Sequence, residues 1–155
     1  FYQADQSLFG AKAELVWHRE NIYYRNVMPV SEKHPARILW YVSSEKKVTT
    51  GRDKGIVACS YLDEVTIASA RSLFHRFKNF GIYEWKDVYE LAEQNSDKVI
   101  KAIKFSDTEV FKNKIDLNKI TQILNENGRK KNTFTSPLEV SKEIFNKIYE
   151  IGKEL

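Results

Sequence analysis

The chain has 155 residues, of which 42% are hydrophobic and 13% aromatic, so it can bury one substantial core. With 30% charged residues and no apolar run near the roughly 20 residues that a membrane-spanning helix needs, an integral membrane protein is excluded. The single cysteine, Cys59, and three dispersed histidines exclude a disulfide-stabilised fold and a thiolate zinc site. We therefore expect no metal, no cofactor and a reducing, cytoplasmic location.

The formal net charge of +4 favours contact with polyanions but is too small for a basic tail. The chain starts at Phe1, and its first residues lack the charged-then-apolar layout of a signal peptide. We expect a single domain over residues 1–155, and the missing initiator methionine favours a fragment of a longer protein with a catalytic domain before it.

The first part of the chain is strand-like. Residues 13–16 and 22–27 are rich in β-branched and aromatic residues. Residues 37–43 are almost continuously apolar, as in a strand that is buried on both faces. A polar stretch over residues 44–54 follows, and residues 55–65 resume as a long strand. The last two strands should form an antiparallel pair.

Helical spacing dominates the rest of the chain. It predicts helices over residues 68–80 and 85–94, with a strand over residues 99–105 after them. Asp116 can cap a further helix that ends at Gly128. The last helix has two possible starts, a capping box at residues 136–139 or a cap at Ser141. Because strands come in neighbouring pairs, this order predicts an α+β domain with a mainly antiparallel, barrel-like sheet.

Sequence motifs for catalysis are missing. The sequence has no GxGxxG, P-loop, GxSxG or HExxH motif. His18, His34 and His75 lie in three different predicted elements, so they are not expected to act together. Cys59 lies inside an apolar strand, where burial raises the pKa of a thiol. We predict that the domain itself is not an enzyme.

Aromatic residues are mixed with polar ones in three segments, residues 17–26, 40–44 and 81–85. Flat rings stack on a flipped or single-stranded base, amides and hydroxyls read its edge, and arginines hold phosphates. An alternating strand also places half of its aromatic residues in the core, whatever the function. Two clusters of basic residues in loops suit phosphate contacts: Lys46, Lys47, Arg52 and Lys54, and Arg129, Lys130 and Lys131.

The two central strands, residues 37–43 and 55–65, resemble the signature of PUA-like domains of the EVE and ASCH groups. Downstream, residues 82–88 look like a step of PUA-like domains that follow acetyltransferase domains, and residues 103–105 with 111–117 look like their late strand and following helix. The likeness spans residues 13–148. It implies a small pseudobarrel with helices at its ends, and a groove or pocket that binds RNA or a modified base in DNA or RNA.

We therefore predict a nucleic-acid-binding module with a PUA-like small β-barrel. The predicted base pocket is lined by Trp40, Tyr41, Ser43 and Ser44. The predicted rim consists of Tyr24, Arg25 and Trp85, and the predicted phosphate contacts are Lys46, Lys47 and Lys54. The sequence leaves open whether the ligand is RNA or DNA, and whether the base is modified.

Two other interpretations stay open. In one, this is a regulatory or interaction domain attached to an acetyltransferase or another enzyme, and its aromatic residues form the core. In the other, the chain resembles ASCH-like domains that hydrolyse modified nucleosides, with Lys12 and Glu14 as an acid–base pair. Affinity for oligonucleotides that falls steeply with salt separates nucleic-acid binding from the first alternative, because phosphate contacts release counterions.

Overall fold

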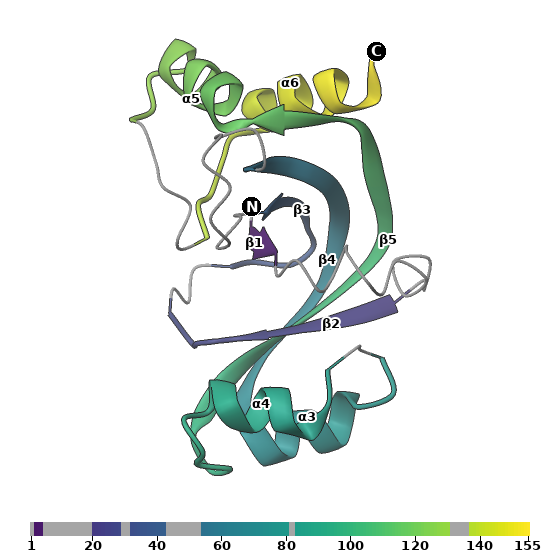
Figure 1. Cartoon of the computed structure of the whole chain (residues 1–155), viewed down its shortest axis with the longest axis vertical. Coiled ribbons are helices and arrows are strands. Elements are labelled where there is room, and N and C mark those ends of the chain that lie inside the picture. Colours follow the sequence, from purple (N-terminus) through teal and green to yellow (C-terminus); the bar gives the residue numbers. More distant parts are fainter. Residues whose placement is uncertain (1, 5–19, 29–31, 43–53, 81–82, 131–136) are drawn as a thin grey trace. The chain divides into compact units, whose positions relative to one another are not determined.

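A computed structural model describes residues 2–4, 20–28, 32–42, 54–80, 83–130 and 137–155. The strands are β1 (Tyr2–Ala4), β2 (Glu20–Arg25), β3 (Ala36–Val42), β4 (Gly55–Ser69) and β5 (Val99–Asp116). They follow the order β1-β3-β4-β5-β2 in one sheet (Figure 1), in which β1 is parallel to β3 and β2 is antiparallel to β5. The helices are α3 (Ala70–Phe77), α4 (Trp85–Leu91), α5 (Leu117–Glu126) and α6 (Lys142–Lys153).

The chain divides into two compact units. The first unit comprises residues 1–11, 37–60 and 109–155, and the second comprises residues 12–36 and 61–108. Strands β4 and β5 each contribute residues to both units. The sequence of the first unit has 14 basic and 10 acidic residues, whereas that of the second has 11 of each, so the whole net charge of +4 belongs to the first.

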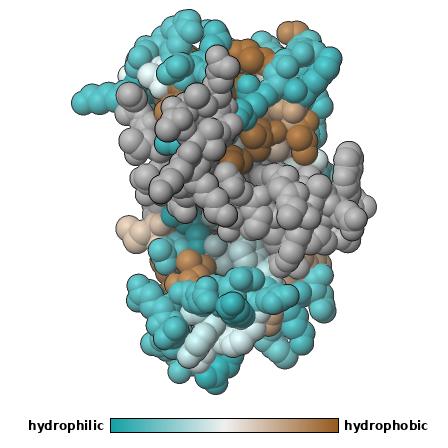
Figure 2. Space-filling model, viewed as in Figure 1, coloured by the Kyte–Doolittle hydropathy of each residue, from teal (hydrophilic) through white to brown (hydrophobic). Residues whose placement is uncertain are grey.

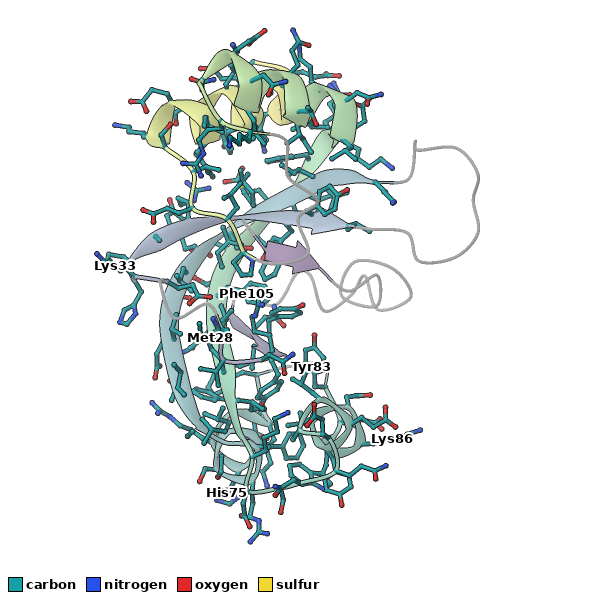
Figure 3. The ribbon with its side chains drawn as sticks, turned by 90° about the vertical axis from the view of Figure 1, so that its left-hand side faces the viewer. Met28, Lys33, His75, Tyr83, Lys86 and Phe105 are labelled. Atoms are coloured by element: carbon teal, nitrogen blue, oxygen red, sulfur yellow. The ribbon has the colours of Figure 1, made fainter. Side chains whose placement is uncertain are left out.

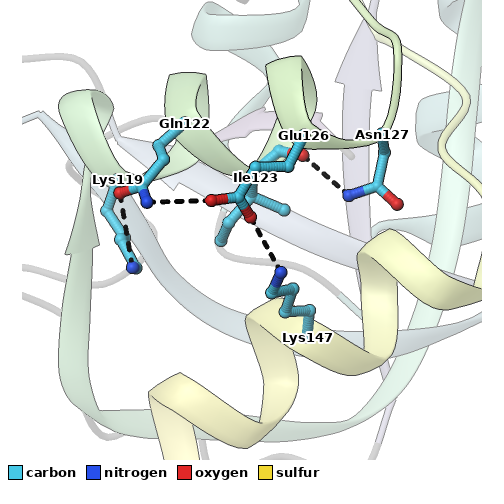
Figure 4. Close-up of polar contacts among 6 residues, drawn as sticks. All are labelled: Lys119, Gln122, Ile123, Glu126, Asn127 and Lys147. Carbon is cyan, nitrogen blue, oxygen red and sulfur yellow. Dashed lines mark hydrogen bonds and ion pairs between the residues drawn. The ribbon is translucent and has the colours of Figure 1, made fainter.

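The core of the first unit lies between its strands and the apolar faces of α5 and α6. It contains Leu39, Tyr41, Ile56, Cys59, Phe111, Ile115, Ile120, Ile123, Leu124, Ile144 and Ile148. A β-carbon added at Gly152 would overlap the ring of Phe111, so the glycine lets α6 approach β5 closely. At the surface, an ion pair of 2.8 Å joins Glu126 on α5 to Lys147 on α6 (Figure 4). Glu126 also accepts a hydrogen bond from Gln122 on its own helix at 2.9 Å.

A second set of polar contacts attaches α6 to the strands of the first unit. The Arg37 guanidinium lies over the Phe145 ring, 5.0 Å from its centre, and donates a hydrogen bond to Cys59 Sγ at 3.3 Å. The Glu109 carboxylate binds Lys153 at 3.0 Å and accepts a hydrogen bond from the Tyr149 hydroxyl at 3.0 Å. The bond from Lys153 is the largest cause that lowers the pKa of Glu109 below its ordinary value.

The core of the second unit lies between one face of β2 and β5 and the helices α3 and α4. Its buried members are Ile22, Tyr24, Ala70, Leu73, Phe77, Val88, Ala92, Ile100 and Ala102. In the view of Figure 2, the solvent side of these two helices is mainly hydrophilic, as expected for amphipathic helices that cover a sheet.

Helix caps confirm several predicted boundaries. Asp116 accepts a hydrogen bond from the Lys119 backbone at 2.8 Å and caps α5, and Gly128 follows its end with a φ of +73°. Ser141 caps α6 by accepting from the Ile144 backbone at 3.3 Å. Of the two possible starts of the last helix, the structure therefore has the one at Ser141.

Other boundaries differ from the prediction. The predicted strand over residues 99–105 continues to Asp116, through the polar residues 106–109 that hide its alternation in the sequence. Strand β4 likewise continues to Ser69 instead of ending at residue 65. Helices α3 and α4 end at Phe77 and Leu91, each three residues early. The predicted strand over residues 13–16 lies outside the described residues.

The predicted fold class is confirmed. The structure is α+β with a mainly antiparallel sheet that does not close on itself, which agrees with an open pseudobarrel. Among the described residues, none of the helices combines the length and apolar character required to span a bilayer. A single domain and a cytoplasmic location stay predictions.

Candidate nucleic-acid interface

The two aromatic residues predicted to line the base pocket belong to the first unit, and both are buried. Trp40 is fully buried, and its indole Nε1 donates a hydrogen bond to Ser60 Oγ at 2.8 Å. Tyr41 is 2% exposed, and burial raises the pKa of its hydroxyl. A base could stack on either ring only after the core opened. Their predicted role stays a prediction, and Ser43 and Ser44 lie outside the described residues.

The residues predicted at the rim, Tyr24, Arg25 and Trp85, all belong to the second unit. Tyr24 is buried in its core, where desolvation raises the pKa of the hydroxyl, and that hydroxyl has no hydrogen-bond partner among the described residues. Arg25 is half-buried and donates a hydrogen bond to the Met28 carbonyl at 3.0 Å. Trp85 is half-buried at the start of α4.

Tyr83 contacts one residue of the predicted rim, Tyr24. Its ring contacts Tyr24 edge-on at 5.4 Å and Tyr23 at 6.3 Å between ring centres. Figure 3 shows Tyr83 beside the helix that carries Lys86. Because β2 is an edge strand of the sheet formed by the described residues, a ring placed beside it can contact two consecutive residues whose side chains lie on opposite faces.

A row of three rings continues over the helices of the second unit. Phe74 lies 5.4 Å from Trp85, and Trp85 lies 5.7 Å from Tyr89, measured between ring centres. Tyr89 is 37% exposed, so the row runs from a partly buried ring to an open one. Elsewhere in this unit, Lys104 Nζ lies 4.9 Å from the centre of the exposed Phe80 ring. We call Phe74, Trp85 and Tyr89 the ring row.

The predicted phosphate contacts lie in the first unit, and only Lys54 is described. It is exposed directly before Gly55, against whose backbone the Lys114 side chain and the Ile115 carbonyl pack. Among the described residues, neither Lys54 nor Lys114 forms an ion pair or a side-chain hydrogen bond. By contrast, Lys112, also on β5, is bound to Glu154. Lys46 and Lys47 lie outside the described residues.

Sequence reasoning missed a buried ion pair in the second unit. Lys101 on β5 is fully buried and binds the carboxylate of Glu32. Desolvation by burial lowers the pKa of Lys101, and the bond to Glu32 opposes that shift. A signal was present in the sequence, because Lys101 alternates with Ile103 and Phe105 and therefore shares a face with two large apolar residues.

The remaining reactive side chains that the structure describes do not form a cluster. His34 and His75 are exposed, and His18 lies outside the described residues, as do Lys12 and Glu14 of the hydrolase alternative. Cys59 is fully buried, and that burial raises the pKa of its thiol despite the nearby Arg37. In the described part of the chain, no three His, Cys, Asp or Glu residues are grouped in a way that could hold a metal ion.

Solved protein structures with a similar fold were found for this chain, although sequence comparisons found no match. No protein-family model matches the sequence, and no curated protein matches it significantly. The crystal structure of ASCH from Zymomonas mobilis is similar at 15% identity and a TM-score of 0.71, over 97% of this chain and 92% of that one. A serine-to-alanine mutant of that protein has the same identity and TM-score, with 93% of its chain covered. A tyrosine-to-phenylalanine mutant gives 14% identity, a TM-score of 0.68 and 95% coverage.

Proposed function

We propose that this chain, which has the PUA-like fold of ASCH domains, is a nucleic-acid-binding module that takes single-stranded RNA or an unstacked, modified base. The observation that carries the proposal is the ring row with its open end at Tyr89. Partly exposed aromatic faces in a row are what unpaired bases stack on, and such stacking is worth about 1–3 kcal/mol per base.

The uncommitted lysines of the first unit are a separate observation in favour of nucleic acid as a ligand. A cation already bound to a carboxylate gains little from a phosphate, whereas Lys54 and Lys114 are exposed and unengaged among the described residues. The net charge of +4 in this unit adds a general attraction to polyanions. Binding should therefore weaken as salt rises, by the release of counterions from the phosphates.

Fluorescence anisotropy tests this function. Labelled single-stranded RNA, single-stranded DNA, and duplexes with and without a methylated base are each titrated at two salt concentrations. We expect binding that weakens with salt and prefers an unpaired or modified base. No binding of any of these probes at micromolar protein would contradict the proposal and favour the interaction-domain alternative.

Matched variants locate the two kinds of contact. We expect Tyr89→Ala to weaken binding several-fold, and Tyr61→Ala, which removes another exposed tyrosine of the second unit, to leave it unchanged. The pair Lys54→Gln and Lys114→Gln should flatten the salt dependence, whereas Lys142→Gln at the start of α6 should not. Equal effects of test and control variants would exclude these residues as the contacts.

A further inference from the structure

Two lysines on the helices of the second unit differ from the other basic residues around them. Lys78, at the end of α3, and Lys86, in the first turn of α4, are both exposed. Among the described residues, neither forms an ion pair or a side-chain hydrogen bond. The other basic residues between Ala70 and Lys98, apart from a histidine, are in ion pairs: Arg71 with Asp97, Arg76 with Glu64, and Lys98 with Glu93.

Helical geometry places these two lysines at the two ends of the ring row. The Lys78 backbone N–H donates to the Phe74 carbonyl at 2.9 Å, so the two residues are one helical turn apart on the same side of α3. Lys86 precedes Tyr89 by three residues on α4, which makes the two side chains neighbours on the helix surface. Phe74 and Tyr89 are the first and last rings of the row, so each end has a cation beside it.

The acidic residues of this segment are mostly held by partners as well. Glu93 and Asp97 are in ion pairs, and the side chains of Glu84 and Asp87 form the capping box of α4. Glu90 is exposed, and among the described residues its carboxylate has no partner. Because it follows Lys86 by four residues, its charge opposes an anion bound there.

Rings with a free cation at each end match the chemistry of a single strand. Its bases stack on aromatic faces, while its phosphates lie at the edge of the stack and attract lysines. A lysine that already holds a carboxylate would have to give up that bond to bind a phosphate, and Lys78 and Lys86 would not.

We infer that α3 and α4 form a binding site for single-stranded nucleic acid within the second unit, in which bases stack on the ring row and Lys78 and Lys86 contact the phosphates at its two ends. This inference rests on the proposed function, because the ligand is the same. It adds phosphate contacts from the unit whose overall charge is balanced, so that binding at the ring row does not require the lysines of the first unit.

The salt dependence of binding tests these contacts in the full chain, with a labelled single-stranded oligouridine as the probe. Lys78→Gln and Lys86→Gln should each weaken binding several-fold at low salt. Each should also reduce the slope of log affinity against log salt by about 0.7, as expected for one phosphate contact with a single strand. Lys33→Gln is the control, because Lys33 is an exposed lysine of the same unit that Figure 3 shows well away from Lys86. Equal effects of the three variants would overturn the inference.

The carboxylate of Glu90 provides a test of opposite sign. Glu90→Gln should strengthen binding of the same probe, because it removes a negative charge next to a bound phosphate. Asp63→Asn is its control, since Asp63 is exposed and lies on the face of β4 opposite to Glu64, whose partner Arg76 is on α3. Unchanged affinity in Glu90→Gln, or an equal gain in both variants, would contradict the placement of a phosphate beside Lys86.

The two proposals can be distinguished by their failures. If Tyr89→Ala weakens binding while Lys78→Gln and Lys86→Gln behave like Lys33→Gln, the proposed function stands and the phosphate contacts inferred here are wrong. If the wild type binds no oligonucleotide, the proposed function fails, and this inference fails with it.

Discussion

Single side chains in this protein owe their roles to what surrounds them rather than to their type. Trp40 and Tyr41 have the chemistry of a base-stacking pair, yet both are buried in the first unit, and the indole of Trp40 is bonded to Ser60. Tyr89, in a segment that reads as an ordinary amphipathic helix, has the more open ring. Exposure is set by tertiary packing, which a sequence pattern reports only on average.

The bond between Trp40 and Ser60 gives the first prediction. Trp40→Phe removes the indole donor and leaves a void beside the buried Ser60 hydroxyl, which should cost about 1–3 kcal/mol of unfolding free energy. Urea denaturation followed by circular dichroism measures it. Adding Ser60→Ala to Trp40→Phe should cost less than the sum of the two single substitutions, because the bond that joins the two side chains is lost only once. An additive double variant would show that the bond contributes nothing.

Two glycines should respond to alanine for different reasons. At Gly152 the added methyl overlaps the Phe111 ring, so Gly152→Ala should destabilise the protein by about 1–3 kcal/mol. At Gly128 there is open space, and only the positive φ opposes a side chain, at about 1 kcal/mol. Thermal denaturation compares them. Phe111→Leu should relieve Gly152→Ala but not Gly128→Ala, and relief of neither or of both would contradict this assignment.

Glu109 should make the stability of the protein depend on acid pH. Its pKa is lowered in the folded state, so its stabilisation is complete above the ordinary value of 4.5 and is lost as pH falls through the folded pKa. The difference in unfolding free energy between wild type and Glu109→Gln should therefore shrink as pH is lowered below about 4.5. Urea titrations at several pH values measure it, with Glu139→Gln as an exposed control. A constant difference would contradict the role of the carboxylate charge.

At the scale of helices and strands, the sequence predicted the strands that are continuous apolar runs. It did not predict the part of a strand that polar residues interrupt. The strands at residues 37–43 and 55–65 were recognisable because an apolar run bounded by polar residues is typical of a buried strand. The second half of β5 was not, since Ser106, Asp107 and Glu109 interrupt it and Asp107 has a φ of +49°. Pairing with a neighbouring strand supplies the backbone bonds that keep such a segment extended.

The candidate site was predictable to a smaller extent. The sequence analysis predicted Tyr24 and Trp85 at one rim, and in the structure Tyr24 lies in the core of the second unit while Trp85 packs against that core. The Lys101–Glu32 pair joins residues 69 positions apart. No local pattern can report such a partner, because it depends on which strand lies beside which. The residue types therefore limited the kinds of ligand that could be proposed. Only the fold shows which residues lie in contact.

The caps of the helices give an element-scale prediction. Asp116→Ala removes the acceptor for the Lys119 backbone and should cost about 1 kcal/mol, whereas Asn118→Ala in the same first turn removes no cap and should be neutral or slightly stabilising. Chemical denaturation measures the unfolding free energy of each variant. Equal losses would mean that Asp116 acts through something other than the cap.

At the scale of the whole molecule, each unit is assembled from distant parts of the chain. The core of the first unit combines Leu39, Tyr41 and Ile56 with α5 and α6, which follow the last segment of the second unit. A fragment that ends between the units therefore lacks half of a core.

Truncation tests this dependence. A fragment of residues 12–108 keeps the second unit but leaves the apolar residues of β3 and the start of β4 without α5 and α6. We expect it to lack dispersed amide signals in a two-dimensional nitrogen–proton spectrum and to aggregate. The full chain is the control. A well-dispersed, monomeric fragment would show that the first unit's helices are dispensable.

The uneven division of charge has a kinetic consequence. Because the excess of four positive charges belongs to the first unit and the second is balanced, a polyanion in solution exerts a torque on the molecule as well as a pull. The molecule should approach with one preferred orientation before any contact forms. Added salt would then slow association more than it speeds dissociation, as in other electrostatically steered encounters.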